Sequence, residues 1–147
     1  MKDKVLKTSK DFFKLKKIKD QGKKIGLCHG VFDLLHVGHI DHFLEAKKKC
    51  DILIVSLTKD EFINKGPNRP VFKTENRIKF LSNLSCLDYI YVSSTDSALD
   101  SIKNIKPNYY FKGPDYKNLK NDITGKIYHE KNLVKIYGGE VLFTETE

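Results

Sequence analysis

The chain has 147 residues, carries 27 Lys and Arg against 19 Asp and Glu for a net charge of +8, and is 39% hydrophobic with no Trp. This length and composition describe one ordinary soluble domain and leave no room for a second. No run approaches the roughly 18 apolar residues that a membrane span needs, and residues 1–20 lack the apolar core of a secretory signal. We therefore expect a cytosolic protein with no membrane partner.

The cysteines and the charge say little about partners. Cys28, Cys50 and Cys86 are odd in number and widely spaced, which favours neither a disulfide framework nor a zinc site, and we expect core thiols. The positive charge suits a polyanion, either a nucleic acid or a nucleotide. Because lysine is abundant throughout the chain, compositional bias in the source explains the charge as well. We expect no nucleic-acid partner.

The predicted elements alternate between helices and strands. A short amphipathic helix, with Ser9 as its N-cap and Gly22 as its stop, comes first. Strands are then predicted at 24–31, 51–58, 89–92, 109–112 and 140–144, and helices at 37–49, from 74, at 97–105 and at 126–137. This pattern predicts a three-layer, Rossmann-like α/β domain with a five-stranded parallel sheet. We expect residues 1–147 to form one domain, with residues 1–23 as an N-terminal helical extension.

The first strand-to-helix junction carries the chemistry, with the sequence GVFDLLHVGH at residues 30–39. In an open α/β sheet, ligands bind at the carboxyl ends of the strands, where a helix N-terminus offers free N–H groups to phosphate. His36 and His39 can lie on one face there, while the missing side chain of Gly38 lets a nucleotide approach the backbone. The alternative is a pair of histidines that binds no ligand. A zinc site is not favoured, because three ligands crowded into one turn give poor geometry.

This segment resembles the HxGH motif of the cytidylyltransferase-like nucleotidyltransferases, and the similarity covers nearly the whole chain from Lys24. The blocks NKGPNRPV (64–71), ENR (75–77), FKGPDY (111–116) and GGEV (138–141) resemble heptose-phosphate adenylyltransferase domains and related sugar-pathway cytidylyltransferases. Glycerol-phosphate cytidylyltransferases are similar too, but their block corresponding to FKGPDY is less alike. The resemblance implies transfer of a nucleotidyl group from CTP or ATP to a phosphate-bearing acceptor, with release of pyrophosphate.

Position and resemblance together assign four residues to catalysis. His36 and His39 would bind the triphosphate and stabilise the transition state, and Lys65 would neutralise charge at the α-phosphate and the acceptor. Arg77, in the first turn of a helix, would clamp the β- and γ-phosphates. The alternatives are a solvated loop lysine at 65 and a surface ion pair of Arg77 with Glu75 or Asp41.

Further residues are predicted to bind the nucleotide. Lys112, Gly113 and Asp115 follow the fourth strand and are placed to read the base, although Gly113 and Pro114 would form a turn in any case. The complete predicted set is Gly30, Val31, Phe32, Asp33, Gly38, Lys112, Gly113 and Asp115. Mg²⁺ is expected as an ion carried by the nucleoside triphosphate, with no metal site made of protein ligands.

The substrates are less well defined than the reaction. We expect CTP with a phosphorylated sugar or small polyol, because the NKGPNRPV and FKGPDY blocks resemble the sugar-pathway cytidylyltransferase-like domains most. One alternative is an ATP-dependent adenylyltransferase acting on a heptose 1-phosphate-like sugar, and another is an inactive nucleotide-binding module. The resemblance also implies a homodimer.

The end of the sequence departs from the family pattern. Relatives carry a Ser/Thr-rich, phosphate-binding helix start after the last strand, whereas this sequence ends at Glu147 before any such segment. In some relatives a domain of this kind is the N-terminal half of a longer protein that carries a sugar kinase. We therefore expect an incomplete catalyst, with a linked kinase domain in the full-length protein.

Overall fold

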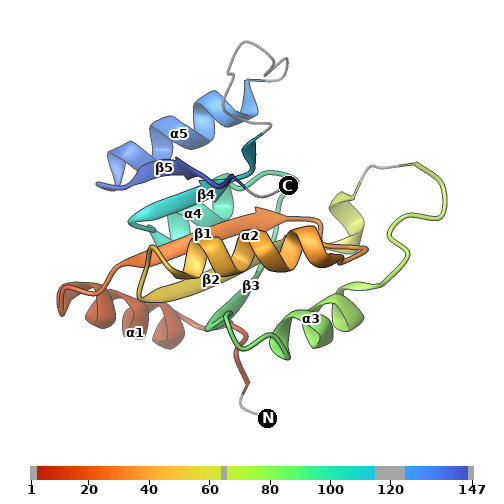
Figure 1. Ribbon diagram of the computed structural model, residues 1–147, viewed down its shortest axis with the longest axis horizontal. Coiled ribbons are helices and arrows are strands. Elements are labelled where there is room, and N and C mark those ends of the chain that lie inside the picture. Colours follow the sequence, from red (N-terminus) through yellow and green to blue (C-terminus); the bar gives the residue numbers. More distant parts are fainter. Residues whose placement is uncertain (1–2, 64–65, 115–124, 146–147) are drawn as a thin grey trace.

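The computed structural model describes residues 3–63, 66–114 and 125–145, whose strands form one parallel sheet (Figure 1). The strands are β1 (Ile25–Gly30), β2 (Ile52–Thr58), β3 (Tyr89–Ser93), β4 (Tyr109–Lys112) and β5 (Glu140–Phe143). The helices are α1 (Ser9–Asp20), α2 (Val37–Lys47), α3 (Thr74–Ser82), α4 (Leu99–Ile105) and α5 (Lys126–Ile136), with a short 3₁₀ helix η1 (Asp60–Phe62) after β2. The predicted Rossmann-like α/β fold with five parallel strands is confirmed.

The strand order β3-β2-β1-β4-β5 places β1 at the centre of the sheet. The chain winds outward from β1 through β2 to β3, then crosses back to lay β4 on the other side of β1. Cys28 of β1 pairs with Val55 of β2 and with Phe111 of β4. The order of the strands reverses between β1 and β4, and ligands of open α/β sheets bind at the carboxyl ends of strands at such a switch point.

The sheet is covered on both faces. One face packs Cys28, Leu53 and Val55 against Phe43 of α2 and Leu81 of α3. The other face packs Ile25, Leu27, Ile54 and Tyr110 against side chains of α1, α4 and α5. Figure 1 shows α2 and α3 on the near side of the sheet. The burial of β2 is nearly continuous, as is typical of a parallel strand covered on both faces.

The N-terminal segment differs from the prediction in its cap. Thr8, not Ser9, is the N-cap of α1: Asp11 N–H donates to Thr8 Oγ1, while the Asp11 carboxylate accepts the N–H of Thr8 at 3.0 Å. A cap at Ser9 would place Phe12 three residues on, where it offers no acceptor in return. Upstream of the cap, Leu6 N–H donates to Ile90 O and Ile90 N–H donates to Lys4 O, so residues 4–6 pair along the outer edge of β3.

The three cysteines are free thiols. Cys28 is buried as predicted, whereas Cys50 and Cys86 are only partly buried. The Cys50 thiol donates to Ala46 O at 3.4 Å. Burial raises the pKa of all three thiols, which keeps them protonated at neutral pH.

Candidate active site

The turn from β1 into α2 is built around the ring of Phe32. Phe32 has a left-handed backbone, with φ of 52°, and its ring folds back over Gly30. A Cβ on Gly30 would lie 2.9 Å from Phe32 Cζ, closer than real Cβ atoms come to another atom. The same ring lies edge-on to Phe43 and His39, with centroids 5.3 and 5.9 Å away. Gly30 therefore makes room for Phe32, and Phe32 supports His39.

His36 and His39 are locked together at the start of α2. His36 is the N-cap, and its Nδ1 accepts the N–H of Gly38 at 3.0 Å, while His39 Nδ1 accepts the N–H of His36 at 3.2 Å. Their ring centroids are 4.2 Å apart. Because each Nδ1 accepts a hydrogen bond, the proton of each neutral ring is on Nε2. The turn thus sets two Nε2–H donors beside the positive end of a helix dipole, an arrangement suited to phosphate.

Asp33 fastens the loop after β2 to this turn. Its carboxylate accepts the N–H groups of Val71 and Phe72 at 2.7 and 2.8 Å and lies 3.4 Å from Arg69 Nη1. Burial raises the pKa of Asp33, but the hydrogen bonds from Phe72, Val71 and Arg69 outweigh it and leave the pKa below its usual value. Asp33 was predicted to bind the nucleotide. Its geometry is that of a loop anchor, and the same contact gives Arg69 an anchoring role.

Arg77 is not placed as a phosphate clamp. It is 1% exposed, and its guanidinium donates to Phe72 O, Val31 O, Thr58 O, Asp60 Oδ1 and Thr74 Oγ1. These five bonds use all five N–H groups that an arginine has. In this arrangement no N–H group of Arg77 remains for the predicted phosphate clamp, and its ion-pair partner is Asp60 rather than Glu75 or Asp41. Arg77 instead joins the carboxyl ends of β1 and β2 to η1 and α3.

Lys112 and Gly113 lie beside the histidine turn because β4 is the neighbour of β1. Lys112 Nζ is 3.6 Å from Glu130 Oε1, with both side chains largely buried. The Glu130 carboxylate also accepts from Tyr110 Oη at 2.8 Å and from Ala98 N–H at 3.3 Å. No atom of the described residues lies within 4 Å of a Cβ built on Gly113, so the backbone there is open toward them. Lys65 and Asp115 lie outside the described residues.

Two contacts that sequence reasoning missed join α2 to the end of β5. His42 Nδ1 is 2.6 Å from Thr144 Oγ1, and the Glu45 carboxylate accepts the N–H of Glu145 at 3.0 Å. Burial is the main cause that lowers the pKa of His42. The signal was available: His36, His39 and His42 recur every three residues, which places His42 one turn further along the same helix.

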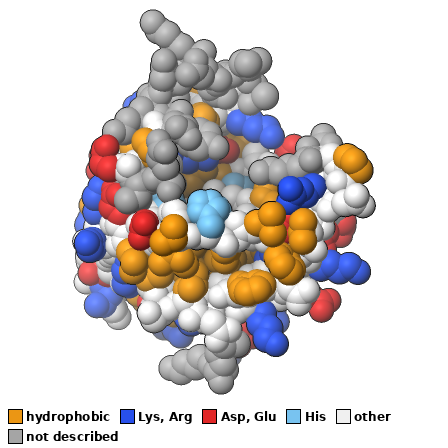
Figure 2. Space-filling view, turned by 45° about the vertical axis from the view of Figure 1, so that its right-hand side comes forward, with side chains coloured by type: hydrophobic (Ala, Val, Ile, Leu, Met, Phe, Trp, Pro, Cys, Tyr) orange, Lys and Arg blue, Asp and Glu red, His pale blue; other side chains and the backbone are white. Residues whose placement is uncertain are grey.

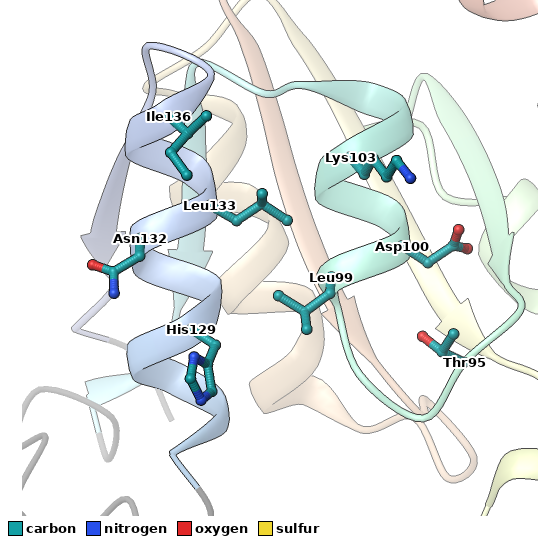
Figure 3. A pocket seen from close by; sticks show the side chains of 8 residues that line it. All are labelled: Thr95, Leu99, Asp100, Lys103, His129, Asn132, Leu133 and Ile136. Atoms are coloured by element: carbon teal, nitrogen blue, oxygen red, sulfur yellow. The ribbon is translucent and has the colours of Figure 1, made fainter.

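Side chains around the turn are partly apolar. Leu34, Val37 and Val71 are 48%, 73% and 52% exposed. Figure 2 shows histidine side chains near the middle of this face with hydrophobic side chains beside them. A hollow of about 370 Å³ lies elsewhere, between α4 and α5 (Figure 3). Leu99, Leu133 and Ile136 line it, and it shares no residue with the histidine turn.

Residues 3–63, 66–114 and 125–145 contain neither a candidate metal cluster nor a candidate membrane-spanning helix. Within them, no three His, Cys, Asp or Glu side chains gather in a way that could hold a metal ion. Among the helices of those ranges, none is long and apolar enough to cross a membrane.

The family model described as cytidylyltransferase-like matches residues 27–145, a span that holds the whole sheet except the first two residues of β1. The chain belongs to the cytidylyltransferase-like family. The matched residues include the HVGH turn, the loop anchored by Asp33 and the end of β4. It confirms the resemblance stated from the motifs.

Curated relatives extend this similarity. The chain is 37% identical over 123 residues to the bifunctional protein HldE of Syntrophotalea carbinolica and 36% identical over 139 residues to that of Aliarcobacter butzleri. These matches cover 82% and 92% of the chain but only 24% and 29% of the relatives. The chain thus spans about a quarter of the length of these curated proteins.

Solved structures of the same fold include two with other titles. A lipopolysaccharide core biosynthesis protein from Thermoplasma volcanium has a TM-score of 0.70 at 23% identity, covering 86% of this chain and 99% of that one. Pantoate-beta-alanine ligase from Francisella tularensis has a TM-score of 0.66 at 19% identity, covering 99% of this chain and 68% of that one. At these identities the similarity concerns the fold.

Proposed function

We propose that this chain transfers the adenylyl group of ATP to a sugar 1-phosphate, of the heptose 1-phosphate type, and releases pyrophosphate. Membership of the cytidylyltransferase-like family supports nucleotidyl transfer. The HldE relatives favour the heptose-phosphate adenylyltransferase alternative, and with it ATP as the nucleotide. The relatives do not support the prediction from sequence that CTP is the nucleotide, and we propose ATP in its place.

The reaction is an in-line displacement at the α-phosphorus. An oxygen of the acceptor phosphate forms the new P–O bond, and the bond to the β-phosphate breaks as pyrophosphate leaves. Because the acceptor is already ionised at pH 7, the protein must supply position and positive charge rather than a base. The observation that carries the proposal is the pair of imidazoles whose Nδ1 atoms are held by backbone N–H groups. Their Nε2–H groups would donate to phosphate oxygens as charge develops.

The other residues have supporting roles in this proposal. The N-terminal N–H groups of α2 would face the triphosphate, and Lys65 would neutralise charge at the α-phosphate and the acceptor. Lys112, held by Glu130, and the open backbone at Gly113 would border the base. Asp33 and Arg77 would position the loop that forms one wall of the site.

Magnesium fits the site as an ion bound to the nucleotide. The histidine turn offers imidazole donors rather than a cluster of carboxylates, and Mg²⁺ takes phosphate oxygens and water readily. When bound, the ion would neutralise charge on the triphosphate. The protein's own residues would then orient the phosphates against the acceptor.

Pyrophosphate release with ATP and with CTP, measured against a panel of sugar 1-phosphates and glycerol phosphates, tests the proposal. We expect turnover with ATP and a sugar 1-phosphate to exceed that with CTP. Faster turnover with CTP would restore the cytidylyltransferase alternative. Nucleotide binding without pyrophosphate release from any pair would indicate the inactive module.

A further inference from the structure

The net charge of this protein is concentrated in its N-terminal segment. Residues 1–24 contain ten lysines and three aspartates, a net charge of +7, whereas residues 25–147 contain 17 Lys and Arg against 16 Asp and Glu. Compositional bias would spread the excess along the chain. The excess instead belongs to α1 and the residues that flank it.

The packing of α1 sorts its residues into two faces. Phe12 and Leu15 pack against the sheet: Leu15 is 2% exposed, and Phe12 lies edge-on to Tyr91 with ring centroids 5.6 Å apart. Lys10, Phe13, Lys14 and Lys17 have the i, i+3, i+4, i+7 spacing of one helical stripe, and all four are exposed. We call these four residues the basic stripe. Phe13 within it is 57% exposed, with Lys17 Nζ 5.0 Å from its ring centroid.

Further lysines crowd the C-terminal end of α1. Lys19 Nζ donates to Lys106 O at 2.8 Å, which joins this end to the end of α4. Burial, together with the charges of Lys106 and Lys24, lowers the pKa of Lys19. Lys23 and Lys24 follow directly and are exposed. The cationic surface thus reaches the amino end of β1, whereas the histidine turn follows the carboxyl end of that strand (Figure 1).

We propose that the basic stripe docks the protein on an anionic lipid surface, with Phe13 inserted at the level of the headgroups. Lysines on an amphipathic helix attract acidic lipids, and an aromatic ring among them adds apolar contact. All basic side chains of residues 1–24 are lysines, and a lysine ammonium lacks the planar fork with which arginine binds phosphate bidentately. This favours a diffuse anionic surface over a nucleic acid. Surface docking needs no spanning helix, so it amends the expectation of no membrane partner.

The position of α1 has a consequence for the bound state. Because the stripe lies on α1 and the histidine turn lies at the other end of β1, docking leaves the carboxyl edge of the sheet open to soluble nucleotide. The proposal therefore does not depend on the proposed reaction. It predicts that loss of lipid binding and loss of turnover arise from different variants.

Co-sedimentation with vesicles tests this inference. The parent should sediment with phosphatidylcholine vesicles that contain about one third phosphatidylglycerol, should not sediment with pure phosphatidylcholine vesicles, and should be released by salt. The triple variant Lys10→Gln, Lys14→Gln, Lys17→Gln should bind about a hundredfold more weakly. Phe13→Ala should weaken binding roughly tenfold.

A matched control changes the same charge elsewhere. Lys48→Gln, Lys79→Gln, Lys135→Gln removes three exposed lysines, one from the C-cap of α2, one from α3 and one from α5, and should leave vesicle binding within about threefold of the parent. Equal loss in the two triple variants, or no sedimentation of the parent with acidic vesicles at low salt, would overturn the proposal. Tighter binding of the parent to a short DNA duplex than to the vesicles, abolished by the stripe variant, would also overturn it and indicate a nucleic acid. Melting temperatures of all variants establish that they are folded.

Discussion

The ring of Phe32 occupies the space that a side chain on Gly30 would need, and its edge rests against His39. The glycine at the end of β1 is therefore tied to the orientation of a histidine nine residues on. A motif that reads as a phosphate-binding turn is also a small packing unit in which glycine, phenylalanine and histidine depend on one another.

Gly30→Ala should expel the Phe32 ring from its place. Overpacking of this kind typically costs about 1–3 kcal/mol of the free energy of unfolding, and we expect a loss of turnover as His39 loses its support. Denaturant unfolding measures the first effect. Gly113→Ala is the matched substitution, because a Cβ there meets no atom of residues 3–63, 66–114 or 125–145 within 4 Å, and it should leave the free energy of unfolding unchanged. Equal stability of the two variants would contradict this packing account.

His36→Asn separates capping from chemistry. Asparagine is a good N-cap and can still accept the N–H of Gly38, but it removes the Nε2–H donor. We expect an unchanged melting temperature and a fall in turnover of about 10²-fold, as for the loss of one preorganised donor. His39→Asn should act similarly. His129→Asn, on the exposed surface of α5, serves as the control. If His36→Asn and His39→Asn both keep turnover within threefold of the parent, the two histidines take no part in the reaction.

Arg77→Gln should unfold the protein more easily rather than weaken nucleotide binding selectively. It leaves the partly exposed Asp60 carboxylate and three backbone carbonyls without their donors, and each buried acceptor left unsatisfied costs about 1–3 kcal/mol. Arg69→Gln, with its single 3.4 Å contact to Asp33, should cost less than about 1 kcal/mol. An Arg77 variant with the parent's stability and a raised KM for nucleotide would instead support the predicted role of Arg77 in binding the β- and γ-phosphates.

Stability should fall in acid partly through His29. Burial, and then the charge of Lys112, lower the pKa of His29 from 6.5 to about 3, so the folded protein holds this ring neutral. The unfolded chain takes up a proton below pH 6.5, and the free energy of unfolding therefore decreases as pH falls from about 6.5 toward 3. His29→Asn should flatten this part of the profile, as chemical unfolding at a series of pH values would show. A variant with the parent's slope would mean that other groups cause it.

Most of the fold could be predicted from the chain itself, because hydrophobic runs and their breaks mark each element. The strand predicted at 109–112 matches β4, and the helix predicted at 126–137 is one residue longer than α5. The strand order could not be predicted, since it depends on contacts between residues far apart. The N-cap of α1 was predicted one residue too late because Thr8 and Ser9 offer similar hydroxyls. Only the hydrogen bond that the Asp11 carboxylate accepts from the N–H of Thr8 decides between them.

The candidate site was predictable in position but less so in role. The turn that holds His36 and His39 follows from the motif and its place after a strand. The partners of Arg77 and Asp33 could not be predicted, because a charged side chain near a phosphate site can either contact the ligand or hydrogen-bond the protein's own backbone. The backbone groups that decide it come from residues as distant as Val31 for Arg77 and Phe72 for Asp33.

Residues 4–6 cover the outer edge of the sheet at β3. An uncovered parallel edge presents a row of backbone donors and acceptors that can recruit another chain. Here Lys4 and Leu6 occupy that row at Ile90, and the burial of Leu6 at 5% exposed fixes them there. Trimming this short segment would leave the histidine turn intact and open a template for aggregation. Residues 4–6 thus keep this edge of the sheet from pairing with another chain.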